Sequence, residues 1–337
     1  MFAVLSRILG SNTPPVPSSS NLRPRIQSLY SFDHKNASWT EQKRAAISPS
    51  DYISKFSLAT WNIDFSSPLP ILRLKSALDY LEQLLSPLLN SDNDNPPPPT
   101  IILLQELHKS CFPTLLSNKY IRAVYDVSDI SPVSWNKDSS YGTVTLVPKP
   151  LSQYVSFIFR TPFPSTIMGR DALYVDFSFP GPSPHDDGER NTTKIRVGNT
   201  HLESLPGHGD KARTQQLASI SEFLSCSPLD CGVVCGDMNA ISPSDSTLVE
   251  DVGLLDAWTS SVEMENAADE ADGHTWGYQP PTVFPPNRLD KILFVGGLRV
   301  DGIERIGVGL KHANADASDD NAWVSDHYGL LAKFTII

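Results

Sequence analysis

A series of short apolar runs, each followed at once by polar or charged residues, constrains the fold of this chain more than any other feature. Residues 56–63, 101–104, 195–200 and 232–235 are apolar and rich in β-branched or aromatic residues, which predicts buried strands. The same reasoning predicts strands at 141–147, 155–159, 172–179, 289–295 and 329–334. Apolar residues spaced by three and four predict helices at 71–88 and 210–224. One continuous mixture of strands and helices indicates an α/β (α+β) fold in a single globular domain.

Composition excludes two classes of protein. About 40% of the 337 residues are apolar, which is too many for a wholly disordered chain. The sequence contains no run of about 18 apolar residues, so we expect no membrane-spanning helix and no membrane partner. The four cysteines form no C-x-x-C pair, which argues against a zinc knuckle and favours a reducing compartment.

The N-terminal part of the chain differs in composition from the rest. We expect residues 1–50 to be a flexible arm and 51–337 to be the globular domain, because 10–25 are rich in Ser, Pro and Asn. Tyr30, Phe32 and Trp39 are aromatic residues that could attach the end of this arm to the domain. Residues 1–32 contain three arginines and no acid, so the segment is either a disordered tail, the interpretation we favour, or a mitochondrial presequence.

Polar side chains follow four of the predicted strands directly. Asn62 and Asp64 follow the first, and Glu106 follows the second. Two further groups follow strands in the same way, His201 with Glu203 and Asp237 with Asn239. A fifth group, Asp326 with His327, stands just before the last strand. Any one group could be a turn or a helix cap. Five groups together indicate a single site at one edge of the fold.

The chemistry of this set points to phosphodiester hydrolysis. Glu106 offers the hard oxygen that Mg²⁺ or Mn²⁺ prefers, and Asp237 could accept a proton from water. His201, Asn239 and His327 could donate hydrogen bonds to the charged oxygens of a reacting phosphate. The sequence has no G-x-x-x-x-G-K-[ST], G-x-S-x-G or H-E-x-x-H motif, which excludes several other hydrolase mechanisms. We therefore interpret the chain as a metal-dependent phosphodiesterase.

Five segments resemble the signatures of the endonuclease/exonuclease/phosphatase superfamily, in the family's order, over residues 56–337. They are Thr60-Trp61-Asn62, Leu104-Gln105-Glu106, Asn199-Thr200-His201-Leu202, Gly236-Asp237-Met238-Asn239 and Ser325-Asp326-His327. The resemblance implies a two-sheet β-sandwich flanked by helices, with the site at one edge and Mg²⁺ or Mn²⁺ as cofactor.

Further segments resemble the 5′-tyrosyl-DNA phosphodiesterase branch of that superfamily: 61–64, 162–166, 200–204, 274–276, 288–290 and 325–331. This resemblance implies a DNA-repair enzyme that hydrolyses the 5′-phosphotyrosyl bond between DNA and a trapped topoisomerase. The implied partners are DNA 5′ ends bearing a tyrosyl adduct and the adjoining single strand. A broader nuclease, or a phosphodiesterase acting on DNA, RNA or phospholipid headgroups, is the alternative. A binding protein with a decayed site is a third, which the filled catalytic positions oppose.

The resemblance also implies residue roles. Glu106, with Asn62, would hold the metal, and Asp237 would position or activate water. Asn62, His201, Asn239 and His327 would hold the phosphate. Asp64 would assist substrate binding by orienting its neighbours, and Asp326 would fix the tautomer of an imidazole. Trp276 would stack on a nucleobase or belong to the core, whereas Arg213 and Arg288 would contact DNA or support loops.

Two features count against tight DNA binding. Ala240-Ile241-Ser242 stand where the family often has a basic residue after its fourth signature, and the net charge is −11. A local strip of basic residues could still bind DNA, and we expect it to come from Lys149, Arg160, Arg170, Lys211 and Lys291. We expect modest affinity that salt weakens strongly, a monomer, and a location in the nucleus and/or cytoplasm with a mitochondrial pool as a further option.

Overall fold

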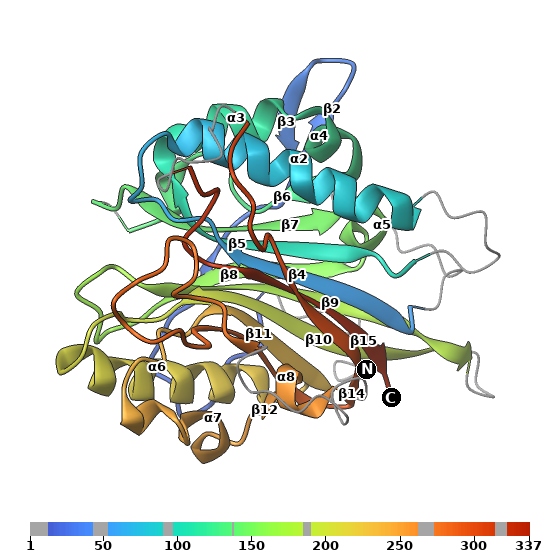
Figure 1. The fold of residues 1–337 in the computed structure, drawn as a ribbon. Coiled ribbons are helices and arrows are strands. Elements are labelled where there is room, and N and C mark those ends of the chain that lie inside the picture. The colour runs from blue at the N-terminus through green and yellow to red at the C-terminus, as the bar shows by residue number, and fades with distance from the viewer. Residues whose placement is uncertain are drawn as a thin grey trace.

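Two β-sheets packed face to face form the centre of the molecule, with helices on both outer faces (Figure 1). The structure is a computed structural model that describes residues 13–42, 53–89, 97–136, 138–184, 190–261, 273–313 and 322–337. This architecture confirms the predicted α+β fold with a two-sheet sandwich flanked by helices.

The first sheet has seven strands in the order β1-β8-β9-β10-β11-β13-β12. These strands are β1 (Arg25–Ile26), β8 (Val155–Pro162), β9 (Asp171–Pro184), β10 (Arg190–His201), β11 (Cys231–Asp237), β12 (Leu255–Asp256) and β13 (Asp290–Gly296). The second sheet has eight strands in the order β14-β15-β4-β5-β7-β6-β2-β3. These are β2 (Tyr30–Asp33), β3 (Ser38–Glu41), β4 (Lys55–Asn62), β5 (Thr100–His108), β6 (Tyr125–Val127), β7 (Tyr141–Pro148), β14 (Leu298–Ile306) and β15 (Gly329–Ile336).

Helices cover the outer face of each sheet (Figure 1). Over the eight-stranded sheet lie α2 (Pro70–Leu89), α3 (Phe112–Ser117) and α4 (Lys119–Val124), with α5 (Lys149–Ser152) following β7. Over the seven-stranded sheet lie α6 (His208–Leu224), α7 (Leu248–Asp251) and α8 (Ala257–Ser260). Single-turn helices occupy Lys109–Cys111 (η1), Pro132–Ser134 (η2) and Pro243–Asp245 (η3). The largest apolar cluster fills the space between the sheets, as expected for a sandwich.

Two parallel strand pairs determine where the functional residues lie. The pair β4–β5 is connected through α2, and the pair β10–β11 is connected through α6. Because the strands of a parallel pair run in the same direction, their carboxyl ends lie at the same edge of the sheet. In β10–β11 the pairing sets His201 opposite Asp237. Gly236, with φ of 141°, permits this close approach, because a Cβ there would lie 1.9 Å from the Thr200 carbonyl oxygen.

The N-terminal segment is more structured than the expected arm of residues 1–50. The described part, 13–42, contributes β1 to one sheet and the hairpin β2–β3 to the other. Phe32 is buried, and the Trp39 Nε1 donates to the Leu116 carbonyl at 3.0 Å. The aromatic residues therefore attach this segment to the domain, and the domain extends beyond the expected boundary at residue 51. Residues 1–12 and 43–52 lie outside the described residues.

Within the described ranges, no helix combines the length and the apolar character needed to cross a bilayer. The four cysteines are buried and unpaired.

Candidate active site

The predicted site residues that follow the four strands come together at one edge of the sandwich. Asn62 ends β4, Glu106 lies near the end of β5, His201 ends β10 and Asp237 ends β11. His327 lies two residues before β15 and is bridged to Trp276. The convergence follows from topology, because the two parallel pairs bring four strand ends to the same edge.

Asp237 is the centre of the site. Its Oδ2 lies 3.1 Å from Asn62 Nδ2, 3.3 Å from His201 Nε2 and 3.8 Å from His327 Nε2. Its Oδ1 accepts from the backbone N–H of Asn239 at 2.8 Å. Burial of Asp237 opposes ionisation, but the imidazoles of His327 and His201 and these donors outweigh it and hold the pKa of the carboxyl well below its ordinary value. Asp237 is therefore an ionised acceptor.

The hydrogen bonds of His201 determine its tautomer. The Nη1 of Arg170 lies 2.6 Å from His201 Nδ1. Because a guanidinium can only donate, Nδ1 is the acceptor, and the imidazole proton sits on Nε2. That proton points to Asp237 Oδ2. His201 is thus held as a donor toward the centre of the site.

His327 is held from behind by Asp290, at the start of β13. The distance from His327 Nδ1 to Asp290 Oδ2 is 2.6 Å, and both side chains are buried. Burial alone would lower the pKa of His327, but Asp290, Asp326 and Asp237 together raise it well above the ordinary value. His327 is consequently a cation whose Nε2 faces the centre of the site.

This pairing corrects one predicted role. Asp326 was expected to fix an imidazole tautomer, but its Oδ1 lies 3.9 Å from His327 Nε2, which is too far for a hydrogen bond. Its Oδ2 instead accepts from Trp276 Nε1 at 3.2 Å. Partial desolvation raises the pKa of Asp326, although His327 opposes the shift and 38% of the Asp326 side chain is exposed. Asp290 orients His327, and Asp326 connects Trp276 to the site.

Glu106 occupies an irregular position in its strand. The register between β5 and β7 shifts between Leu104 and Leu107, and Glu106 has φ of 58°, in the left-handed region. A bulge of this kind re-aims a side chain. The Oε2 accepts from the Phe65 backbone N–H at 3.0 Å, and the side chain is 14% exposed. Glu106 therefore presents an ionisable carboxylate at the rim of a pocket.

The donor set fits a divalent cation. Among the described residues Glu106 has no lysine or arginine partner, although His201 Nδ1 lies 3.6 Å from its Oε1. A partly exposed carboxylate without such a partner suits a hard cation that keeps several waters. Asn62 lies close to Asp237, but its Oδ1 also accepts from the Asp64 backbone N–H at 3.0 Å. A second group, Asp237, Asp290 and His327, offers ligand atoms within 4.8 Å of one another. In that group His327 Nδ1 and Asp290 Oδ2 are hydrogen-bonded to each other, which occupies two of the ligand-bearing side chains. We therefore regard Glu106 as the principal metal ligand.

Asn239 and Asp64 lie at the site but make internal contacts. Asn239 Nδ2 donates to the Leu202 carbonyl at 3.0 Å, which fixes the loop after β10. Asp64 pairs with the buried Arg73 at 3.1 Å and accepts from the backbone of Ser66 and Ser67. Asp64 therefore orients its neighbours, as expected, and its carboxylate is already occupied with protein donors.

The two predicted arginines lie in different surroundings. Arg213 is fully buried, pairs with Asp245 and Asp210, and donates to the Glu203 and Leu205 carbonyls. This is the loop-supporting alternative, so the substrate-binding role predicted for Arg213 does not fit the structure. Arg288 pairs with Asp256 at 2.6 Å, with 17% of its side chain exposed, and lines a separate surface groove.

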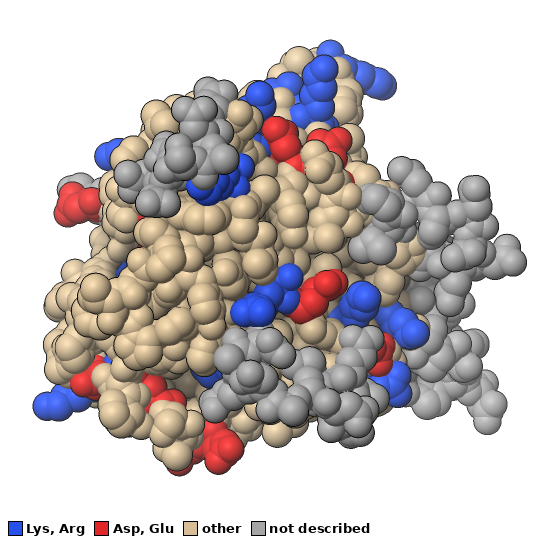
Figure 2. Space-filling model, in the orientation of Figure 1, with Lys and Arg blue, Asp and Glu red and all other residues tan. Residues whose placement is uncertain are grey.

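The expected basic strip is also incomplete. Arg160 is buried between Asp129 and Asp171, at 2.9 and 3.1 Å, and cannot reach a ligand on the surface. Arg170 is buried at the site itself. Figure 2 shows lysines and arginines in small scattered groups on the face it draws.

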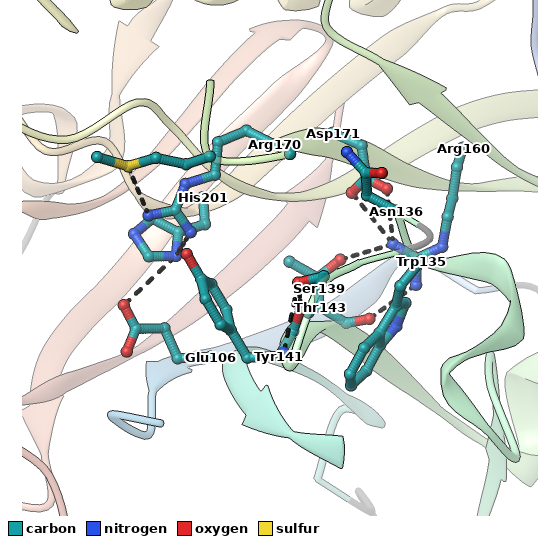
Figure 3. Close-up of a pocket in the computed structure, with 13 residues that line it drawn as sticks. Glu106, Trp135, Asn136, Ser139, Tyr141, Thr143, Arg160, Arg170, Asp171 and His201 are labelled. Atoms are coloured by element: carbon teal, nitrogen blue, oxygen red, sulfur yellow. Dashed lines mark hydrogen bonds and ion pairs between the residues drawn. The ribbon is translucent and has the colours of Figure 1, made fainter. Parts of the chain in front are cut away.

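Sequence reasoning missed three residues that the structure places at the site. Asp290 holds His327, and Arg170 holds His201. Tyr141 lies beside Arg170 and Glu106 in Figure 3, with the Arg170 guanidinium 5.2 Å from its ring centre. The resembling segment 288–290 contains Asp290, which was the available signal. Nothing in the local pattern around Tyr141 singled it out.

Comparison with known proteins agrees with this geometry. The model of the Endonuclease/Exonuclease/phosphatase family matches residues 59–327. Tyrosyl-DNA phosphodiesterase 2 of Xenopus tropicalis is 25% identical over 295 residues, which cover 84% of this chain and 67% of that protein.

Solved structures share the fold. A truncated tyrosyl-DNA phosphodiesterase 2 (TDP2) of Caenorhabditis elegans has a TM-score of 0.61 at 21% identity, covering 83% of this chain and 97% of that one. TDP2 of D. rerio in complex with a single-strand DNA product has a TM-score of 0.59 at 21% identity, covering 84% and 99%. An endonuclease/exonuclease/phosphatase of Bacteroides vulgatus has a TM-score of 0.57 at 17% identity, covering 84% and 100%. Since the family model spans most of the globular part and includes all five signatures, the chain belongs to the endonuclease/exonuclease/phosphatase family.

Proposed function

We propose that this protein hydrolyses the 5′-phosphotyrosyl bond that joins DNA to a tyrosine of a trapped topoisomerase. The observation that carries the proposal is the arrangement around one open edge of an ionised Asp237, a cationic His327 and a partly exposed Glu106. These are an anionic acceptor, a cationic donor and a hard metal ligand, the three groups that metal-assisted phosphodiester hydrolysis requires.

The roles follow from the contacts. A divalent cation bound at Glu106 would polarise a phosphoryl oxygen and neutralise charge there. Asp237 accepts a hydrogen bond from the attacking water and orients it toward phosphorus. His327 donates from Nε2 to an oxygen that gains negative charge in the transition state. The bond from the water oxygen to phosphorus forms as Asp237 takes a proton from the water, and the bond from phosphorus to the tyrosyl oxygen breaks. The tyrosyl oxygen leaves as a phenolate that solvent protonates, and the DNA keeps the 5′-phosphate.

Three considerations support a tyrosyl leaving group. A phenol has an ordinary pKa of about 10, so its oxygen leaves more readily than a sugar alkoxide and depends less on a general acid. Arg170 is buried without a carboxylate partner among the described residues, beside the Tyr141 ring and His201. A buried unpaired cation is costly and suits an anionic or aromatic ligand. The Xenopus relative bears the name of the enzyme with this activity.

The decisive experiment uses an oligonucleotide carrying a 5′-phosphotyrosine, incubated with Mg²⁺ or Mn²⁺ and, separately, with a chelator. We expect tyrosine release that requires metal. Plain single strands, an abasic duplex, RNA and a phospholipid headgroup ester serve as comparison substrates. Faster cleavage of any of these than of the tyrosyl adduct would favour the broader phosphodiesterase instead.

Substitutions at the site test the assigned roles. Glu106→Gln and Asp237→Asn are each expected to lower kcat by at least about 10²-fold, because each removes a charge that acts in the transition state. Thermal unfolding monitors whether both variants are folded, and Glu304→Gln on the partly surface-exposed strand β14 is the control. Near-native turnover in both site variants would refute these roles.

A further inference from the structure

Glu203 is a buried carboxylate that none of the roles assigned above uses. It follows β10 by two residues, as Asn239 follows β11, and its side chain is fully buried. Burial opposes ionisation of Glu203, but the hydrogen bonds that its carboxylate accepts outweigh burial and lower its pKa. Glu203 is therefore an ionised group whose charge is satisfied within the protein.

Four donors occupy the Glu203 carboxylate. Its Oε1 accepts from the backbone N–H groups of Ile167 and Met168, at 3.0 and 3.1 Å. Its Oε2 accepts from the hydroxyl of Thr166 at 2.7 Å and from the side-chain amide of Gln216, on α6, at 3.3 Å. A carboxylate has about four acceptor positions, so none is left for a metal ion or a water. Three of the donors lie in the loop between β8 and β9, which indicates that the carboxylate holds this loop.

The loop between β8 and β9, residues 163–170, positions Arg170. The Thr166 hydroxyl that donates to Glu203 also accepts from the Arg170 backbone N–H at 2.8 Å. The Arg170 carbonyl accepts from the Phe163 N–H at 3.1 Å, so both polar groups of the Arg170 main chain are held. Because an ionised carboxylate can only accept, it makes Thr166 the donor and leaves the lone pairs of the hydroxyl for Arg170.

Arg170 connects this loop to the active site (Figure 3). Its Nη1 donates to His201 Nδ1 at 2.6 Å, which leaves the imidazole proton on Nε2, toward Asp237. Without that donor, Nδ1 would be free to carry the proton and to donate to Glu106 Oε1, 3.6 Å away. The lone pair of Nε2 would then face Asp237 Oδ2 at 3.3 Å, and two acceptors would oppose each other. The position of Arg170 thus determines the direction in which His201 donates.

We propose that Glu203 is a positioning residue for phosphodiester hydrolysis at this site. It fixes the loop between β8 and β9, and through Thr166 and Arg170 it determines the tautomer of His201. The proposal rests on the proposed function only as far as metal-assisted phosphodiester hydrolysis, and it does not depend on a tyrosyl leaving group. Glu203 itself is enclosed by protein donors and has no contact with the substrate.

The first experiment breaks the link at Glu203 and at Thr166. In Glu203→Gln the amide NH2 meets donors on one side of the group, so kcat should fall about 10- to 100-fold, the usual range for an orienting partner. Thr166→Val keeps the shape of the side chain and removes the hydroxyl, and kcat should fall at least about tenfold. Thr166→Ser keeps the hydroxyl and should restore near-native kcat, and Glu304→Gln on β14 is the distant control.

A double-mutant cycle distinguishes positioning from general support of the fold. If Glu203 acts through Arg170, Glu203→Gln should cause no further loss of kcat in a protein that already carries Arg170→Gln. Losses that multiply would overturn the proposal, as would near-native kcat in both Glu203→Gln and Thr166→Val. Thermal unfolding shows which variants are folded, and Thr166→Val, in a partly exposed loop, gives the same cycle if Glu203→Gln does not fold.

The ring nitrogens of His201 provide a readout that does not require turnover. In Mg²⁺-loaded protein labelled with ¹⁵N-histidine, we expect the proton on Nε2 in the wild type and a population with the proton on Nδ1 in Thr166→Val. An identical tautomer in both proteins would overturn the proposal. Hydrolysis of bis-para-nitrophenyl phosphate without release of tyrosine from the 5′-phosphotyrosyl oligonucleotide would instead remove the proposed function, and the cycle on the former ester would still decide the role of Glu203.

Discussion

His327 owes its charge to the carboxylates around it. It is buried, which alone would favour the neutral ring, and Asp290 contacts its Nδ1 at 2.6 Å. Asp290 Oδ1 has no hydrogen-bond partner among the described residues, so the imidazole is the main partner of this carboxylate. A buried pair of this kind keeps the ring oriented and protonated at the pH at which the enzyme would act.

Replacement of Asp290 by Asn should therefore affect the pH profile as well as the rate. We expect kcat to fall about 10- to 100-fold, the usual cost of losing such an orienting partner. Loss of the negative charge lowers the pKa of His327, so its protonated form, and activity with it, should disappear at a lower pH than in the wild-type protein. The measurement is kcat against pH, with Asp301→Asn, whose carboxylate pairs with exposed Arg299, as control. An unchanged alkaline limb would contradict the role of Asp290.

The sequence predicted the residues of the site better than the contacts between them. Asn62, Glu106, His201, Asp237 and His327 were identified because each stands at the end of an apolar run, and the structure brings them together. The partner of His327 was assigned to the adjacent Asp326, whereas Asp290 lies 37 residues away in sequence and reaches it across the fold. Tertiary pairing of this kind leaves no local pattern to detect.

The loop between β4 and α2 depends on one buried ion pair. Arg73, in the first turn of α2, contacts Asp64 and also donates to the carbonyls of Ile63 and Val324. Burial opposes ionisation of Asp64, but Arg73 and the donors of Ser66 and Ser67 outweigh it and lower its pKa. The loop directly follows Asn62, so this pair supports the site.

We expect Asp64→Asn to destabilise the fold by about 3–5 kcal/mol near pH 7, because it leaves the Arg73 charge buried without a partner. A carboxyl whose pKa is lower in the folded state stabilises the protein above its unfolded pKa of about 3.9. That contribution is lost as pH falls through the folded pKa. The difference in unfolding free energy between wild type and variant should thus shrink below about pH 4, as measured by denaturant titration at several pH values. A difference that is independent of pH would contradict this account.

Replacement of Arg213 distinguishes a role in supporting a loop from a role in binding DNA. It joins α6 to the loop after β10 and to η3 through Glu203, Leu205 and Asp245. Arg213→Met should lower the free energy of unfolding by about 3–5 kcal/mol. The slope of DNA affinity against salt should not change, because no phosphate contact is lost. A shallower slope with unchanged stability would restore the DNA-contact role.

Most elements could be predicted, and those that were missed have identifiable causes. The buried strands β4, β5, β10 and β11 and the helices α2 and α6 have strong apolar patterns, and their positions were predicted closely. The strand β14 was missed because its alternation of apolar and charged residues is interrupted near Gly302, where its pairing with β15 shifts register. The N-terminal strands are short and lie at or next to the edges of the sheets. Their stability therefore comes from contacts with residues that are distant in sequence, such as the hydrogen bond from Arg160 Nε to Gln27 Oε1 at 3.2 Å.

At the scale of the whole molecule, the distribution of charge opposes the binding of a DNA substrate. The chain carries −11, which repels nucleic acid at long range, and the face in Figure 2 has no continuous basic strip among its described residues. The cations near the site are few: Arg170 beside His201, and Arg288 with Lys291 along the groove after Asn239, both close to Asp256. Binding should then depend on the end of the strand and its first phosphates.

This arrangement predicts a measurable salt dependence that is shallower than the strong one expected from the sequence. With two or three phosphates contacted, the slope of log affinity against log salt concentration should be roughly −2 for single-stranded DNA, at about −0.7 for each contact. Binding of a 5′-phosphorylated oligonucleotide, measured by anisotropy from low to high salt with the catalytically silenced Glu106→Gln protein, gives this slope. Arg288→Gln should make it shallower by about 0.7, whereas Arg299→Gln, on the strand β14, should leave it unchanged. Affinity that does not vary with salt, or a slope steeper than roughly −5, would mean that DNA is held elsewhere on the molecule.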